Sequence, residues 1–254
     1  MISIAISMIM FIFAFGGSLL GMFLRPILPE HHQSEESRNI VVLGIGVIAT
    51  MTAIVLGLLV EGAQSSFREQ RSEIAQMSAN VILLDRVLAR YGPETKEARG
   101  LLRHSVVRIL DQFWPKNSSQ PVPLDPAKTE TEVLYDKIQS LEPYNDAQRS
   151  LQAEALSLAL NIEQTPLLIL LQQFRRIPVP FLVVVSVLVL WVTTIFLSFG
   201  LSSPCNTTVI AILFLSALSV SAAIFLIVEF NRPFEGLIRM PSDPLLEALS
   251  YLGR

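Results

Sequence analysis

Apolar and polar positions along residues 40–91 follow a pattern that predicts one long helix. The first half is apolar throughout, whereas the second half is soluble in composition. One apolar stripe nevertheless continues through both halves at alternating spacings of three and four residues, the repeat of helices that pack along their length. The stripe consists of Ala53, Leu56, Val60, Ala63, Phe67, Gln70, Ile74, Met77, Val81, Leu84, Leu88 and Tyr91. We therefore expect one continuous helix that spans the membrane and continues into water, and the alternative is two helices separated at Glu61 and Gly62.

Four segments are apolar over the length of a membrane span, which is about 20 residues for a helix. They cover residues 2–24, 40–60, 177–201 and 207–228, and none has an ionisable side chain in its interior. The first lacks the basic start and the cleavage site of a secretory signal, so we expect it to stay as an anchor. Arginines near the segment ends gather beside the central region and the tail. The positive-inside rule therefore predicts that both termini and the central region are cytoplasmic.

The central region, residues 61–176, has the pattern of a helical bundle. Its long helix should end at Tyr91, because Gly92 and Pro93 are typical of a helix end followed by a new element. Further helices are predicted over 93–114, over 129–141 and from 145 into the third span. We expect Pro166 to kink the last of these helices rather than to end it.

These patterns predict an all-α integral membrane protein with four transmembrane helices. A cytoplasmic helical bundle would be formed largely by extensions of membrane helices 2 and 3. The expected domains are transmembrane helices 1 and 2 (1–60), the cytoplasmic helical domain (61–176), transmembrane helices 3 and 4 (177–228) and a cytoplasmic tail (229–254).

Composition agrees with this fold class and narrows the chemistry. Hydrophobic residues make up 51% of the chain and charged residues 16%, which is more apolar than an ordinary soluble domain. The central region is nearly neutral and has no basic stripe, so nucleic-acid binding is not expected. The single cysteine, Cys205, cannot form an internal disulfide. Because the sequence lacks HExxH, GxSxG and a Gly-rich phosphate loop, we expect neither an enzyme nor a cofactor.

A metal site in the first loop is the weaker of two interpretations for a cluster of potential ligands. Glu30, His31, His32, Glu35 and Glu36 follow the first apolar segment, and both imidazole and carboxylate groups bind metals. Adjacent histidines on a loop without a regular pattern seldom converge on one ion. We therefore favour a solvated loop and expect no metal.

The second span has small side chains along one face, at Gly46, Ala49, Ala53 and Gly57. Small residues let helices approach closely in lipid, which makes packing the favoured use of this face. The same residues could border a pore, because small side chains leave a wide passage. In that case the pore-lining set would be Thr50, Ala53, Gly57 and Glu61. The seam of an oligomer or of the helical bundle would be Phe67, Ile74, Met77, Val81, Leu84 and Leu88.

The end of the fourth span contains a motif with two interpretations. Glu229 and Arg232 are expected at the membrane interface, where charge is tolerated. Asn231, Pro233 and Phe234 would either fold the tail back against the bundle or simply stop the helix beside the membrane. The sequence does not separate these two alternatives.

Several stretches together resemble a bacterial family of bestrophin-like membrane proteins. They are LGLLVEGAQSSF, NVILLDRVLARYG, PVPFLVVV and ALSVSAAIFLIVEFNRPFEGLIRM, and they occur in order over almost the whole chain. Bestrophins proper are pentameric anion channels with four membrane helices per subunit, both termini inside and the second helix lining the pore. The resemblance implies the same layout here, in a bacterial inner membrane.

Two bestrophin features are not carried over by this resemblance. Bestrophins have an Asn-Pro-Phe motif followed by an acidic run that binds calcium. Here Arg232 separates Asn231 from Pro233, and only Glu235 follows Phe234 before Gly236. The second span contains no Phe, so the aromatic neck of bestrophin pores is also missing. A calcium site is therefore not implied.

Two functions remain open at this stage. The first is a homo-oligomeric channel for small inorganic ions, anions in preference, with a pentamer as the first guess and the second span lining the pore. Against anions stands the carboxylate of Glu61 at the expected cytoplasmic mouth. The alternative is a membrane-anchored scaffold or sensing module whose cytoplasmic helices bind a partner protein. Ion-coupled transport is disfavoured, because the spans contain no ionisable groups at membrane depth.

Overall fold

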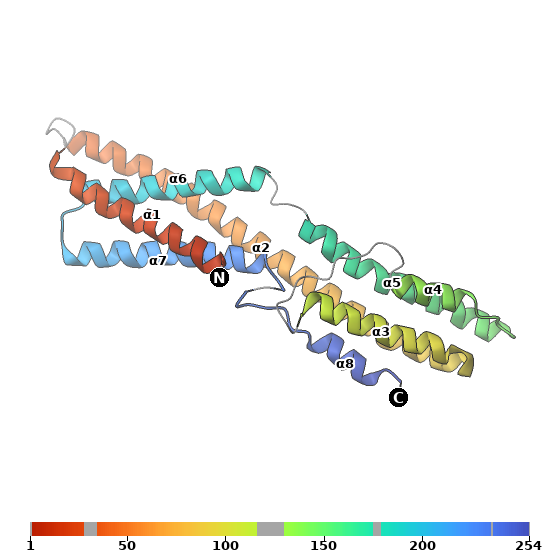
Figure 1. Ribbon diagram of the computed structural model, residues 1–254. Coiled ribbons are helices and arrows are strands. Elements are labelled where there is room, and N and C mark those ends of the chain that lie inside the picture. Colours follow the sequence, from red (N-terminus) through yellow and green to blue (C-terminus); the bar gives the residue numbers. More distant parts are fainter. Residues whose placement is uncertain (1, 28–34, 116–129, 175–178, 235, 254) are drawn as a thin grey trace. The chain divides into compact units, whose positions relative to one another are not determined.

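The computed structural model describes residues 2–27, 35–115, 130–174, 179–234 and 236–253, and it contains helices and no strand among them (Figure 1). The helices are α1 (Ile2–Leu24), η1 (Arg25–Ile27), α2 (Glu35–Tyr91), η3 (Pro93–Thr95), α3 (Lys96–Phe113), α4 (Glu130–Gln139), α5 (Asp146–Phe174), α6 (Val179–Ser202), α7 (Thr207–Phe230) and α8 (Asp243–Tyr251). The predicted all-α class is confirmed.

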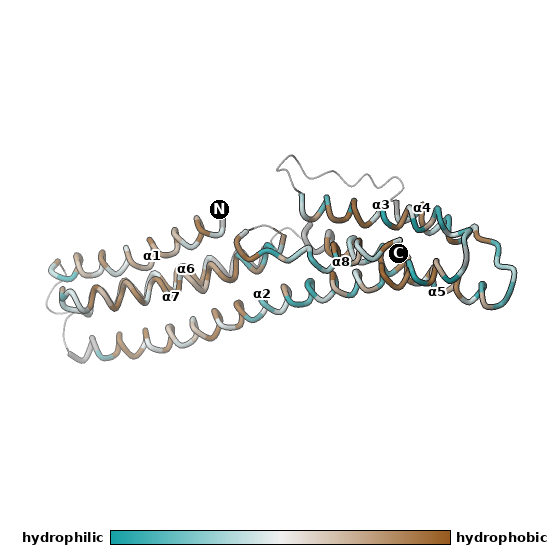
Figure 2. The backbone as a smooth tube through the Cα atoms, turned by 90° about the horizontal axis from the view of Figure 1, so that it is seen from below, coloured by the Kyte–Doolittle hydropathy of each residue, from teal (hydrophilic) through white to brown (hydrophobic). Residues whose placement is uncertain are grey.

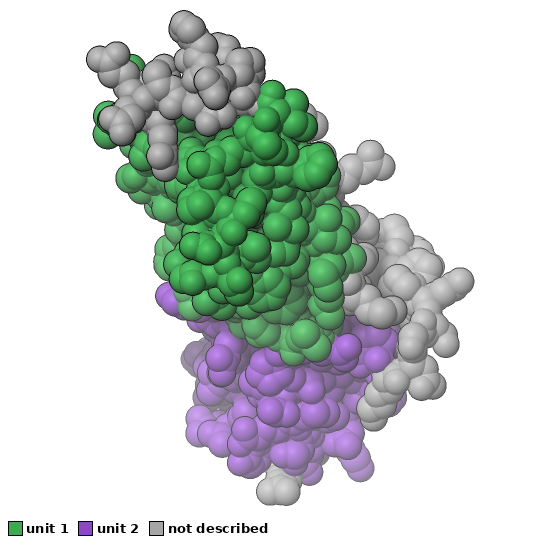
Figure 3. Space-filling model, turned by 90° about the vertical axis from the view of Figure 1, so that its left-hand side faces the viewer, with its two compact units in different colours: residues 1–67, 177–238 green, residues 68–176, 239–254 purple. Residues whose placement is uncertain are grey.

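Two compact units make up the chain (Figure 3). The first unit comprises Met1–Phe67 and Ile177–Ile238, and the second comprises Arg68–Arg176 and Arg239–Arg254. The helix α2 contributes its first part to one unit and its second part to the other.

A single helix, α2, covers the whole stretch with the continuous apolar stripe. It has 57 residues and passes through Glu61 and Gly62 without a break, so the alternative of two helices is wrong. It ends where the sequence predicts, because Gly92 has a φ of 144° and Pro93 opens the short helix η3. A positive φ of this size is readily adopted only by glycine.

The first unit is built on α1, which packs against both α6 and α7. Hydrophobic residues predominate along α6 and α7 (Figure 2). Among the described residues three helices, α1, α2 and α7, are long and apolar enough to cross a membrane, and α6 adds an apolar stretch over Ser186–Ser202. One hydrogen bond joins two of these helices, from the Ser221 hydroxyl to the Ser7 carbonyl oxygen at 2.6 Å.

Glycines allow α1 and α6 to approach closely. A Cβ at Gly21 would overlap the backbone carbonyl oxygen of Leu197, and a Cβ at Gly200 would overlap that of Ser18. The backbones of the two helices therefore meet where both lack side chains, which is the packing that small residues make possible in lipid.

The close α1–α6 contact makes Gly21 intolerant of any side chain. We expect Gly21→Ala to lower the free energy of unfolding by about 1–3 kcal/mol, because the added methyl forces the helices apart. Gly16→Ala is the matched control on the same helix, because nothing lies within 4 Å of a Cβ at that position. Chemical unfolding in detergent micelles measures both variants, and equal stabilities would contradict the contact.

The second unit encloses the later part of the α2 stripe in a core of its own. Ile74, Met77, Val81, Leu84 and Leu88 are all buried. Facing core positions come from the other helices of the unit, with α4 packed on α3 and α5, and α3 packed on α8. These buried residues include Leu102, Val106, Leu134, Ile138, Ala159, Ile162 and Leu245. Pro166 lies inside α5, as predicted, and the continuation towards the third span at 175–178 lies outside the described residues.

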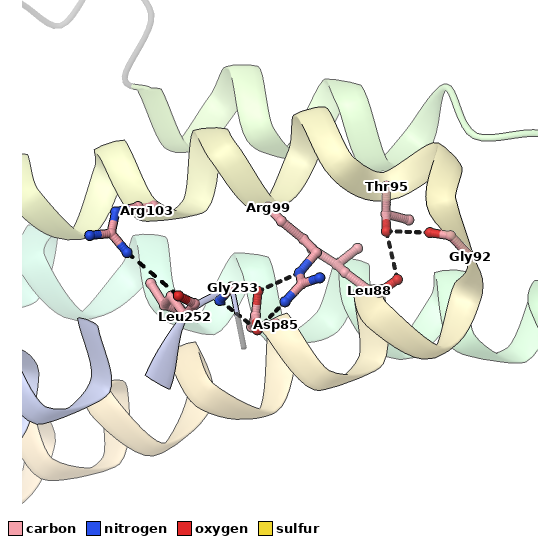
Figure 4. A network of polar contacts seen from close by, with 8 residues as sticks. All are labelled: Asp85, Leu88, Gly92, Thr95, Arg99, Arg103, Leu252 and Gly253. Carbon is pink, nitrogen blue, oxygen red and sulfur yellow. Dashed lines mark hydrogen bonds and ion pairs between the residues drawn. The ribbon is translucent and has the colours of Figure 1, made fainter. Parts of the chain in front are cut away.

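One ion pair fastens α2, α3 and the end of the chain together (Figure 4). The Arg99 guanidinium donates two hydrogen bonds to the Asp85 carboxylate, at 2.7 and 2.8 Å. The Asp85 carboxylate also accepts the Gly253 N–H at 3.4 Å. The Asp85 side chain is only 8% exposed. The hydrogen bonds to the Asp85 carboxylate raise the pKa of the Arg99 guanidinium above its usual value.

Removing the Asp85 charge should weaken the second unit. We expect Asp85→Asn to lower the free energy of unfolding by about 2 kcal/mol, because it leaves a largely buried guanidinium without its carboxylate. Asp146→Asn serves as the control, because its partner Arg149 lies at 3.0 Å on the surface and the Asp146 side chain is 97% exposed. If both variants lost the same free energy of unfolding, burial of the Asp85–Arg99 pair would not add to its contribution to stability.

Glu163 on α5 makes the stability of the second unit depend on pH. Burial raises the pKa of its carboxyl above the ordinary 4.5, and the neighbouring Glu132 adds to the shift. The folded chain therefore holds this proton more tightly than the unfolded chain, and stability should rise as pH falls through the raised pKa towards 4.5.

Glu163→Gln tests this dependence. We expect a higher melting temperature than the parent at pH 7, because the partly buried negative charge is gone, and an advantage that shrinks towards pH 4.5. Glu154→Gln, at an exposed position of the same helix, is the control. Melting curves that shift equally at both pH values would argue against a raised pKa of the partly buried carboxyl at position 163.

Candidate pore-lining face of α2

The four residues expected to line a pore lie on a face of α2 that no other part of the described chain covers. Thr50, Ala53, Gly57 and Glu61 are all exposed. Nothing lies within 4 Å of a Cβ built at Gly57. The Thr50 hydroxyl donates to the Gly46 carbonyl oxygen at 2.8 Å, so this polar group is satisfied within its own helix.

The opposite side of α2 holds the helix to the rest of the first unit. Ile45, Thr52 and Ala63 are buried, and the partly buried Val55, Leu56, Leu59 and Val60 pack against the apolar core of the unit. Because one side is fixed by packing, the face with Thr50 and Gly57 is directed away from the other described helices of the first unit.

Larger apolar side chains continue the uncovered face. Leu43, Val47, Ile54 and Leu58 are between 52% and 72% exposed. They lie beside the small residues around the helix, at positions that follow from 100° of rotation per residue. The uncovered surface of α2 therefore combines a narrow strip of small residues with a broader apolar strip.

An apolar cavity of about 570 Å³ borders the small-residue strip within the first unit. From α2 it is lined by Ala49, Thr52, Ala53 and Leu56, and the remaining lining residues come mainly from α6 and α7. Ala53 therefore lies at the edge between this cavity and the uncovered face. None of the described residues that line the cavity is charged.

The seam residues are used inside the chain. Phe67 packs against Phe230 of α7, with ring centroids 5.5 Å apart. The other five, from Ile74 to Leu88, contribute to the core of the second unit. Their apolar surface is thus occupied by neighbours from the same chain.

The tail motif lies directly behind α7. The Asn231 side-chain amide donates to the Ile227 carbonyl oxygen at 2.8 Å, which closes the last helical turn. The Arg232 N–H donates to the Glu229 carbonyl oxygen at 3.0 Å, and Pro233 is buried. The residues after this turn come back to the helix, because the Leu237 and Ile238 N–H groups both donate to the Glu229 carboxylate.

Sequence reasoning missed the role of Glu229. A charge at the end of a span is expected at the membrane interface, yet this side chain is 1% exposed. The signal that could have revealed it is the glycine seven positions later, because Gly236 has a φ of 107° and leaves space for the carboxylate.

Potential metal ligands do not come together among the described residues. No group of three or more His, Cys, Asp or Glu side chains there could hold a metal ion. Glu30, His31 and His32 lie outside the described residues, and nothing is described of the side chains of Glu35 and Glu36. Cys205 is exposed.

Comparison with known proteins places the chain in a family. Solved structures that match over nearly the full length include a bacterial bestrophin homologue from Klebsiella pneumoniae, with a TM-score of 0.67, 12% identity and 96% of each chain covered. A point variant of a bacterial bestrophin homologue from the same organism matches with a TM-score of 0.65 and 13% identity, covering 95% of this chain and 97% of that one. No curated protein sequence matches. The model of the bestrophin-like domain matches residues 11–245, so the chain belongs to the bestrophin-like family of membrane proteins.

Proposed function

We propose that this chain is the subunit of a homo-oligomeric channel for small inorganic ions, with α2 lining a central pore. The observation that carries the proposal is the uncovered strip of Thr50, Ala53, Gly57 and Glu61 on a helix whose opposite side is fixed by packing. Membership of the bestrophin-like family supports the same arrangement.

Several copies of the chain are needed to enclose such a pore. A single α2 offers only one strip, whereas a ring of copies would surround a passage with small side chains and leave it wide. Because the Thr50 hydroxyl already bonds Gly46, the wall would offer few free polar groups. A pentamer is the first arrangement to test, by resemblance to bestrophins. The family resemblance favours the bacterial inner membrane, and the distribution of arginines favours both termini in the cytoplasm.

Two features of the chain give opposite expectations for the ion selectivity of the proposed channel. The family resemblance favours anions, whereas a ring of Glu61 carboxylates at the cytoplasmic mouth would repel them. Glu61→Gln should therefore increase chloride flux into vesicles relative to potassium flux. If the parent channel passes potassium and excludes chloride, the proposed pore would stand, and the expected preference for anions would be refuted.

Gly57→Leu tests whether the small-residue strip borders the pore. We expect ion flux into reconstituted vesicles to fall by about tenfold or more while the oligomer persists, because a ring of leucines narrows and dries the passage. Gly44→Leu is the matched control, since Gly44 is equally uncovered but lies on a different side of α2.

The outcomes separate the candidate functions. Size measurement in detergent shows whether the Gly57 variant still assembles. An assembled variant that conducts like the parent would refute pore lining by this strip. A parent that is monomeric and passes neither chloride nor potassium would refute the channel and favour a membrane-anchored scaffold.

A further inference from the structure

The Glu229 carboxylate lies where three separate segments of the first unit meet. From the tail, the Ile238 N–H donates to it at 2.9 Å, and the Leu237 N–H donates to the same oxygen. From the start of α1, the side chain of Ser3 adds a hydrogen bond. Both Glu229 and Ser3 are almost fully buried, at 1% and 3% exposed.

Burial of a carboxylate is unfavourable unless its oxygens accept hydrogen bonds. Here the donors come from residues that are distant in the chain or beyond the helix end, and not from neighbouring turns of α7. Two successive backbone amides that converge on one anion form a nest, a concave arrangement of donors that binds negative charge. The tail therefore presents an anion-binding turn to a side chain of its own molecule.

The turn depends on a particular backbone conformation. Gly236 directly precedes the two donating amides and has a φ of 107°. A Cβ at this position would overlap the Glu229 carboxylate. Glycine thus permits both the turn and the close approach of the charged group.

We infer that Glu229 is a positioning residue that fastens the tail to the cytoplasmic ends of α1 and α7 through its negative charge. The residue that follows it, Phe230, packs on Phe67 of α2. The contact that holds the tail is therefore adjacent to the contact that holds α2 to α7. The tail, the first helix and α2 are joined through one turn of α7.

A spin label on the tail tests this inference in the full-length protein in lipid vesicles. Leu237→Cys supplies the label site, since this side chain is 73% exposed and only its backbone is used. Cys205→Ser removes the single native cysteine. We expect Glu229→Gln to raise the population of the mobile label about tenfold, because a hydrogen bond to a charged group is about twice as strong as one to a neutral group.

Two further variants alter residues that surround the Glu229 carboxylate. Gly236→Ala should free the tail to a similar extent, and Ser3→Ala should do so more weakly, since it removes one of three donors. Glu247→Gln, an exposed glutamate on α8, is the control for loss of one charge. Circular dichroism at the same temperature shows whether each variant keeps its helices.

Label mobility in folded Glu229→Gln and Ser3→Ala equal to that of Glu247→Gln would overturn the inference. The measurement requires no conduction. A parent without ion flux would therefore refute the proposed channel and leave the role of Glu229 intact.

Discussion

The structure depends on one apolar stripe that stays on the same side of a helix while its surroundings change. Along α2 the stripe first meets the apolar core of the first unit, at Leu56, Val60 and Ala63, and later the core of the second unit, from Ile74 to Leu88. Backbone hydrogen bonds within a helix are satisfied equally well in lipid and in water, so α2 needs no break between the two. Only the side chains on its other faces have to change character.

This constraint explains why much of the fold could be predicted from the sequence. The spacing of the stripe is local information, and so are Gly92 and Pro93, which end α2 and begin η3. Pro166 remains inside α5, between the buried Ile162 and Ile169, because loss of one backbone hydrogen bond does not by itself end a helix whose neighbouring turns are packed. Periodicity and helix-end chemistry thus determine where the helices lie in the chain.

The same reasoning could not assign the small residues to their partners. Gly57 and Gly46 on α2 have the spacing of a packing motif, yet nothing in the described chain approaches them. The tight contact is made by Gly21 of α1 and Gly200 of α6, and Gly17, four residues before Gly21, also lies against α6. A motif of small residues indicates that another helix can pack closely, but it does not identify that helix. The small residues on the uncovered strip of α2 are thus not used for close helix packing within the first unit, because that packing is made between α1 and α6.

Glu229 shows where rules based on neighbouring residues fail. A carboxylate in the last turn of a membrane helix is normally expected to reach water. Burial is not expected, because removing a carboxylate from water costs free energy. The burial becomes favourable only once the tail amides and Ser3 are brought to it, and these donors come from beyond the helix end and from the opposite end of the chain. The tertiary structure thus stabilises the Glu229 carboxylate, and the carboxylate holds the tail and the start of α1 in place. Since Phe230 lies next to Glu229 and contacts Phe67, the order of the tail and the position of α2 in the first unit rest on adjacent residues of one helical turn.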